Sequence, residues 1–465
     1  MKSQIPNEKT LRAKGAEDTL GASLDAWSLM AKASCAVESE LYAKHDVKRG
    51  LRDIAGKGVL AGLTRIGDVV ATALDGDELV PAPGLLIYRG IDIAQIVEGF
   101  TQDGRHGYEE TCYLLLFGSL PDREQLNLFE KHLAGYRELP KRFVHDAILK
   151  MPSRDVMNAL ARSVLVLYSF DKQPDDISIA NILRQSLQLI AAFPTLTVYA
   201  YQTYVHHFLG RSLVIHRPDP ELSTAENILH MLRPDSKYSK LEAQILDLTL
   251  VLHAEHGGGN NSSFTAHVVS SSGTDTYSTI AASLGSLKGP RHGGANVKVV
   301  QMFEELKAEV YDWEDDQEVQ NYLTRLLDKE AFDRSGLIYG MGHPVYSVSD
   351  PRTLILRQYA EVLASEKGLD KEFRLYAKVE KLAPEVIVKK RKMYKGVCAN
   401  VDFYSGFIYK ILGIPLELYT PVFAIARIVG WCAHRIEEIA NVGKIIRPAY
   451  KSVASRREYI PMDAR

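Results

Sequence analysis

Cysteine is scarce in this chain, and the few that occur are scattered. Among 465 residues there are four, Cys35, Cys112, Cys398 and Cys432. They form no CxxC pair and no disulfide framework, a usage typical of a protein kept in a reducing cytosol.

Excess charge and long apolar runs are also lacking. The formal net charge is −2, which gives no bulk electrostatic case for nucleic acid or a membrane surface. Residues 1–6 are polar and lack the apolar core of a signal peptide. The apolar stretch 187–204 is interrupted by Gln188, Pro194 and Gln202, so it does not read as a membrane span. We therefore expect a cytoplasmic protein with neither a nucleic-acid nor a membrane partner.

Nucleotide-binding motifs are missing as well. No P-loop occurs, and no GxGxxG stands where a strand would pass into a helix, so nucleotide hydrolysis and dinucleotide redox chemistry are unsupported. No repeat period is visible, which argues against a helical solenoid.

What the chain does have is helical periodicity. From about residue 93 onward, apolar residues recur at three-to-four spacing, which predicts helices over 108–116, 123–139, 153–167 and 241–253. Short apolar runs bounded by glycine predict strands at 58–64 and 84–90. Residues 1–55 are polar and predict an extension. The expected fold is mainly α, with a few short strands near the N-terminus.

A histidine lies in a glycine- and proline-rich turn at 288–296. An apolar helical run precedes this turn and an amphipathic one follows it, so His292 stands just before a helix N-terminus. The partial positive charge of a helix start favours a neutral imidazole, which can donate a hydrogen bond to a developing enolate. The alternative is an ordinary helix-capping turn.

Two further histidine-bearing stretches occur. His343 lies in Gly-Met-Gly-His-Pro-Val-Tyr and is followed by Arg352 in Asp-Pro-Arg; alone, that tripeptide is an ordinary turn. His253, Glu255 and His256 cluster in the other stretch, but they do not form the His-Glu-x-x-His zinc pattern. We expect no metal.

Asp402 follows an apolar run and precedes Phe403 and Tyr404. Such surroundings desolvate a carboxylate and raise its basicity, which suits a general base. The alternative is an aspartate that caps a helix beginning near Ser405. Arg427 is a cation within an apolar helix, a costly position that predicts a bound ligand or a buried acidic partner.

In their order and spacing, the stretches 253–260, 288–296, 340–352 and 400–406 resemble the citrate synthase family. The resemblance implies a homodimer whose subunit has a large helical domain (56–293 plus 404–465) and a small one (294–403). It implies catalytic roles for His292, His343 and Asp402. It implies that oxaloacetate is bound by His256, Arg352, Arg427 and, across the dimer interface, Arg447.

The implied reaction condenses acetyl-CoA, a co-substrate, with oxaloacetate and water, and needs no permanently bound cofactor. CoA contacts are expected at Lys395, which belongs to a basic cluster, and at Gly340 and Gly342. A close alternative is a 2-methylcitrate synthase using propionyl-CoA, since one methylene gives only about 1–3 kcal/mol of discrimination. A catalytically silent CoA-binding protein and a metallohydrolase are further alternatives. The chain departs from the common family pattern at Glu255, Gly257 and Ser347.

Overall fold

The computed structural model describes residues 25–53, 58–76, 78–290, 292–391, 396–441 and 443–464. The chain divides into two compact units, residues 1–61 and residues 62–465. In the first unit, residues 25–35 are helical, and the short helices α2 (Ser39–Lys44) and η1 (Arg49–Leu51) follow. Neither α2 nor η1 buries a residue, so these segments contribute no core of their own.

The second unit begins with a hairpin. Strand β1 (Gly67–Asp75) pairs antiparallel with β2 (Glu78–Tyr88), and β3 (Ile91–Asp92) pairs with the end of β2. The strand predicted at 84–90 is confirmed within β2. The strand predicted at 58–64 is wrong: Gly58 makes one isolated bridge, and Leu60 and Leu63 are 84% and 89% exposed. An apolar run without a neighbouring strand has no ladder to join.

Helices are the remaining regular elements among the described residues of this unit, and the four helices predicted from periodicity are confirmed within about three residues. Capping side chains set several of their starts, because an N-cap side chain satisfies otherwise unpaired helix N–H groups. Asp122 and Ser239 form capping boxes at the starts of α5 and α9. In chain order the first helices are α3 (Ile93–Gln102), α4 (Tyr108–Phe117), α5 (Arg123–Tyr136), η2 (Val144–Leu149), α6 (Val156–Tyr168), α7 (Ile179–Leu209), α8 (Thr224–Leu232), α9 (Lys240–His253), α10 (Asn261–Ser270) and α11 (Thr276–Lys288).

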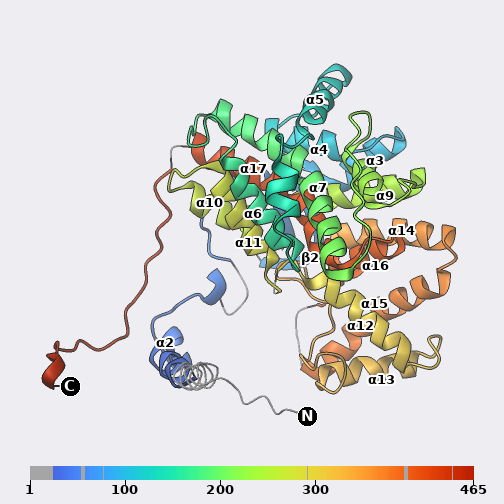
Figure 1. Ribbon diagram of the computed structural model, residues 1–465. Helices are drawn as coiled ribbons and strands as arrows, with labels where there is room; N and C mark the ends of the chain where they lie inside the picture. Colours follow the sequence, from blue (N-terminus) through green and yellow to red (C-terminus); the bar gives the residue numbers. More distant parts are fainter. Residues whose placement is uncertain are drawn as a thin grey trace, which may run out of the picture. The chain divides into compact units, whose positions relative to one another are not determined.

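The core is built around α17 (Tyr419–Ala440), which follows η3 (Leu416–Leu418) and packs against α4, α7, α9, α10 and α11 (Figure 1). Nearly every residue in its first four turns is buried, as expected for a helix that is apolar all round. The stretch Leu416–Ala440 is long and apolar enough to cross a membrane, yet 83% of its apolar window is buried inside the protein. This is the behaviour of a core helix.

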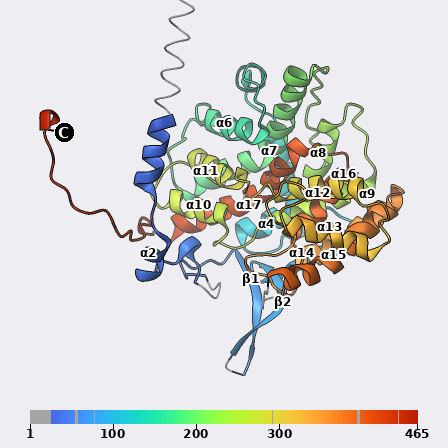
Figure 2. The same ribbon diagram turned by 90° about the horizontal axis from the view of Figure 1, so that it is seen from below.

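A second group of helices comprises α12 (Ala295–Glu309), α13 (Asp316–Leu327), α14 (Pro351–Glu366), α15 (Asp370–Arg391) and α16 (Val401–Ile411). These helices pack on one another and gather on one side of the unit in both views (Figure 2). Gly406 lets α16 cross α12 closely, because a Cβ there would lie 2.9 Å from the Asn296 carbonyl. The small domain predicted at 294–403 covers most of this group, and its boundaries stay a prediction.

The C-terminal segment 443–464 leaves the helical body as an extended, largely exposed segment without regular secondary structure, until it reaches the short helix η4 (Met462–Ala464) (Figure 1). One hydrogen bond ties its start to the body, from the Ile446 N–H to the Ser271 hydroxyl at 3.0 Å.

Candidate active site

Two loops pair side by side: one carries His343, and the other leads into Asp402. The Gly342 N–H donates to the Cys398 carbonyl, and the Asn400 N–H donates to the Gly340 carbonyl, both at 2.8 Å. Gly340 and Gly342 have φ of 82° and 88°, a left-handed region that favours glycine. These glycines therefore shape the loop, and the Gly342 N–H is already used within the protein.

Asp402 lies in the first turn of α16, with its carboxyl group inside the protein. Asn400 caps this helix and accepts a hydrogen bond from the Asp402 N–H at 3.0 Å. The alternative in which Asp402 caps a helix beginning near Ser405 is therefore wrong. Asp402 Oδ1 is buried without a hydrogen-bond partner. Burial raises the pKa of Asp402 from 3.8 to about 7, although Arg352 and Arg427 oppose the shift.

The backbone around His343 selects its neutral tautomer. Nδ1 accepts hydrogen bonds from the N–H groups of Val345 and Tyr346, each at 3.0 Å. A nitrogen that accepts these bonds carries the lone pair, so in the neutral ring the proton is on Nε2. The ring also stacks on Tyr346 with centroids 4.7 Å apart. His343 is thereby prepared to donate a hydrogen bond from Nε2.

His256 lies against His343, with ring centroids 5.2 Å apart. Its Nε2 is buried and has no hydrogen-bond partner. Burial, reinforced by the positive charge of Arg352, holds the pKa of His256 well below its usual value. The loop that carries it is held by Tyr88, whose hydroxyl donates to the Glu255 carbonyl at 3.0 Å.

The chain's departures at Glu255 and Gly257 have a local explanation. Glu255 is fully buried and its carboxylate binds His434 Nε2 at 3.0 Å. Two glycines make room for it: a Cβ at Gly67 would lie 2.9 Å from Glu255 Cγ, and one at Gly430 would lie 2.4 Å from Oε2. Gly257 has a φ of 79°, where a side chain is strained.

Arg352 is a buried cation paired within its own helix start. Its Nε and Nη2 bind the two oxygens of Asp350 at 3.0 and 2.7 Å. Despite burial, the charge of Asp350 raises the pKa of Arg352. The fork is thus held in one orientation, as an arginine that receives a carboxylate requires.

Arg427 is a cation of the site whose guanidinium group lacks part of its hydrogen-bond partners. It is fully buried on α17, its Nε donates to the His253 carbonyl at 2.6 Å, and Nη1 has no partner. Burial lowers its pKa to about 10, with Glu255 opposing the shift. No carboxylate of the described residues forms an ion pair with it, so the expected buried acidic partner is not found. A bound anion is the remaining expectation.

His292 occupies the turn between α11 and α12. Its Nε2 lies 3.2 Å from the Ser262 hydroxyl, which also accepts from Trp431 Nε1 at 3.0 Å. Its pKa is lowered to about 4, mainly by burial and secondarily by Arg427. The expectation of a neutral imidazole holds, but burial rather than the helix start is the main cause.

Of the other predicted residues, Lys395 lies outside the described residues. Arg447 is exposed on the extended C-terminal segment and makes no hydrogen bond or ion pair with the part of the chain that is described. Of the residues clustered with His256 in sequence, His253 Nδ1 binds the Thr249 carbonyl at 2.8 Å, and Glu255 turns to His434.

Sequence reasoning missed several residues that hold the site. Ser262, Trp431, Tyr88 and Asp350 position His292, the His256 loop and Arg352. Asp350 was present in the quoted Asp-Pro-Arg motif, and Tyr88 lay in a segment without assigned chemistry. Ser262 and Trp431 are 169 residues apart and carry no local pattern.

Comparison with known proteins identifies the family of the chain. A family model described as the C-terminal domain of citrate synthase matches residues 54–449. A citrate synthase of Synechocystis is 33% identical over 410 residues, covering 88% of this chain and 92% of that protein. A 2-methylcitrate synthase of Shewanella oneidensis is 32% identical over 385 residues, covering 81% and 91%.

Solved structures agree. A citrate synthase from Thermoplasma acidophilum, solved as a ternary complex with carboxymethyl coenzyme A and oxaloacetate, superposes with a TM-score of 0.72 and 26% identity, covering 90% of this chain and 99% of that one. The site and fold thus define an enzyme of the acyltransferase type. The chain belongs to the citrate synthase family.

Proposed function

We propose that this protein condenses acetyl-CoA with oxaloacetate and water to give citrate and CoA. The observation that carries the proposal is a set of buried polar atoms with unmet bonding capacity: His256 Nε2, Asp402 Oδ1 and Arg427 Nη1. Leaving such atoms unpaired is costly. A dicarboxylate supplies hydrogen-bond acceptors for His256 Nε2 and Arg427 Nη1, while Asp402 Oδ1 is left to take a proton from the methyl group of a neighbouring thioester.

Asp402 removes a proton from the methyl group of acetyl-CoA. Its pKa of about 7 makes it a stronger base than an ordinary aspartate while a large fraction stays ionised at neutral pH. His292 donates a ring N–H to the thioester oxygen, where negative charge develops, and the Ser262 hydroxyl, 3.2 Å from its Nε2, positions the ring.

The enol carbon then attacks the ketone carbon of oxaloacetate. His343 Nε2–H supplies the proton that the ketone oxygen takes up as the carbon–carbon bond forms. Arg352, Arg427 and His256 hold the carboxylates of oxaloacetate. Water adds to the thioester carbonyl of the resulting citryl-CoA, the carbon–sulfur bond breaks, and CoA leaves as a thiol.

CoA is held as a substrate in this proposal, and no permanently bound cofactor takes part. Lys395 contributes positive charge for a CoA phosphate, and the segment Gly340–Gly342 lies beside the thioester. The cytoplasmic location also stays a prediction.

Comparison of acetyl-CoA and propionyl-CoA tests the substrate. With oxaloacetate present, thiol release is measured for both, and kcat/KM is expected to be higher for acetyl-CoA. A higher kcat/KM for propionyl-CoA would assign the protein to 2-methylcitrate synthesis. Absence of thiol release from either substrate would contradict the proposed reaction.

We further propose a homodimer in which Arg447 completes the partner's site. Support comes from the exposure of Arg447 and from the extended segment that carries it. Asp402→Asn subunits mixed with Arg447→Ala subunits are then expected to regain activity. In each hybrid dimer one site keeps Asp402 and receives an intact Arg447, and random mixing makes about half of the dimers hybrid.

Mixing Asp402→Asn with Arg352→Leu is the matched control. Both residues serve the same chain's site, so every hybrid site carries one lesion and activity stays low. With hybrid formation verified by native mass spectrometry, failure of the Arg447 pair to recover would refute the shared site.

A further inference from the structure

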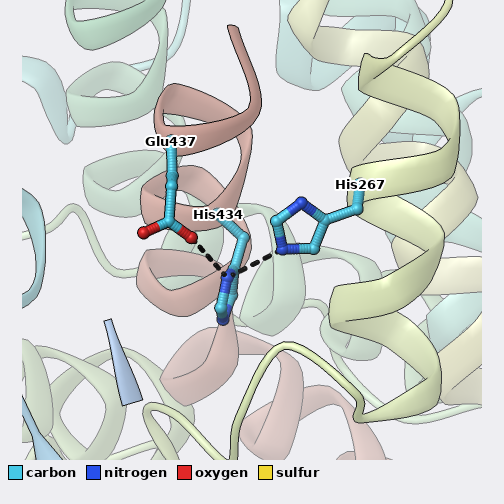
Figure 3. Close-up of side chains that lie close together, drawn as sticks. All are labelled: His267, His434 and Glu437. Carbon is cyan, nitrogen blue, oxygen red and sulfur yellow. Dashed lines mark hydrogen bonds and ion pairs between the residues drawn. The ribbon is translucent and has the colours of Figure 1, made fainter. Parts of the chain in front are cut away.

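A second cluster of titratable side chains lies outside the proposed catalytic groups, between α10 and α17. His267 comes from α10, and His434 and Glu437 come from one face of α17, three residues apart (Figure 3). His267 Nε2, His434 Nδ1 and a Glu437 carboxylate oxygen all lie within 4.8 Å of one another. The two nitrogens are 3.0 Å apart, and Glu437 Oε2 is 3.8 Å from His434 Nδ1.

The outward-facing nitrogens of both rings are bound to carboxylates. His267 Nδ1 lies 2.8 Å from Glu438 Oε2, and His434 Nε2 lies 3.0 Å from Glu255 Oε1. An ionised carboxylate only accepts hydrogen bonds, so each of these nitrogens donates a proton. In neutral rings, both inward nitrogens then carry lone pairs that face each other.

Two facing lone pairs at 3.0 Å require a cation between them. A proton would satisfy the two nitrogens and leave Glu437 Oε2, which is buried and has no hydrogen-bond partner, unsatisfied. A metal ion would satisfy all three atoms. Carboxylate–histidine–metal arrangements of this kind are how proteins orient imidazole ligands.

The surroundings suit a divalent cation. The Glu255, Glu437 and Glu438 carboxylates surround two imidazoles. An open cavity of about 780 Å³ is lined by His267, Glu437 and Glu438 together with Arg65 and Arg89. This cavity gives an entry path and room for a water ligand. A set of two histidines and one glutamate with one open position is a known zinc combination.

We propose that His267, His434 and Glu437 bind one Zn²⁺ ion. The ion joins α10 to the core helix α17 and fixes the ring of His434 against Glu255, which directly precedes His256. It takes no part in the condensation steps. The inference goes beyond the proposed function and does not depend on it, because metal binding is measured without turnover.

The test uses the full-length, tag-free protein. Metal content is measured by mass spectrometry as purified; the protein is then stripped with chelator and titrated with Zn²⁺ alone against a chromophoric competitor. His267→Gln and Glu437→Gln are the test variants. His132→Gln and Glu124→Gln, both exposed on α5, are the matched controls.

One Zn²⁺ per chain is expected for the wild type and both controls. Each test variant is expected to bind at least about 100-fold more weakly, because loss of a mere outer-shell partner already costs about 10–100-fold. Co²⁺ in the stripped protein should give visible d–d bands that the test variants lack. If His267→Gln fails to fold, Glu437→Gln decides, since it keeps both histidines and their carboxylate partners. Sub-stoichiometric binding, or binding that Glu437→Gln retains, would overturn the proposal in favour of a hydrogen-bonded proton.

Discussion

Replacing Asp402 with asparagine is expected to stabilise the ligand-free protein, and to do so increasingly as the pH rises. The carboxylate is buried with Oδ1 unpaired, and its pKa rises from 3.8 to about 7 on folding. The folded state therefore holds a proton that the unfolded state has lost. The wild type loses stability as the pH rises from 3.8 through about 7, because ionising the buried carboxyl group is costly. Asparagine has no such cost.

The magnitude follows from the two pKa values. A shift from 3.8 to about 7 corresponds to about 4 kcal/mol at full ionisation, at 1.36 kcal/mol per unit. Between pH 5 and pH 8, the free energy of unfolding of the variant should rise by about 2.5 kcal/mol relative to that of the wild type. The unfolding entropy is about 2.1 cal/mol/K per residue over 465 residues. The difference in melting temperature between the variant and the wild type should therefore grow by roughly 2–3 °C between pH 5 and pH 8.

Differential scanning calorimetry at pH 5, 6, 7 and 8 measures this difference. The same variant should lose about 10²–10⁴-fold in kcat, the usual worth of a general base. Glu124→Gln, an exposed change on α5, provides the control and should show no pH-dependent gain. A difference in melting temperature that stays constant from pH 5 to pH 8 would refute the burial of an ionising Asp402.

Three further predictions concern the same site. For the wild type, kcat/KM should fall about tenfold per pH unit below about pH 7, because only ionised Asp402 accepts a proton; a flat profile from pH 5 to pH 8 would contradict this. Arg352→Leu should raise the KM for oxaloacetate much more than that for acetyl-CoA, and equal effects in steady-state assays would sink the assignment. Ser262→Ala should lower kcat about tenfold with little change in KM, since it removes the hydroxyl that positions the His292 ring; unchanged kcat would exclude that role.

Local sequence patterns were sufficient to predict most of the helices. Helix starts at Arg123 and Lys240 follow from capping residues that are neighbours in sequence. The strand predicted at 58–64 failed for a different reason. An apolar run indicates only that its residues avoid water. Whether it forms a strand depends on a partner segment elsewhere in the chain. The pairing that does form, β1 with β2, is a local hairpin.

The same distinction separates predicted from missed site residues. Asp402, His343 and Arg352 lie in short motifs, so their chemistry was visible in sequence. The groups that orient them act across long separations: Tyr88 holds the Glu255 carbonyl 167 residues away. Arg427 was identified from the cost of a buried cation, but its lack of an ion-pair partner among the described residues needed coordinates.

Arg352 and Arg427 also link the two substrates through Asp402. Their positive charges lower the pKa of Asp402 and so oppose the effect of burial. In the proposed complex, the two carboxylates of oxaloacetate neutralise these arginines. Asp402 then becomes a stronger base once the acceptor ketone is in place, which favours removal of the acetyl-CoA proton at the moment when the enol can react. Because kcat/KM reports the free enzyme and kcat the complex, the acidic limb of the kcat profile should lie at higher pH than that of kcat/KM for oxaloacetate.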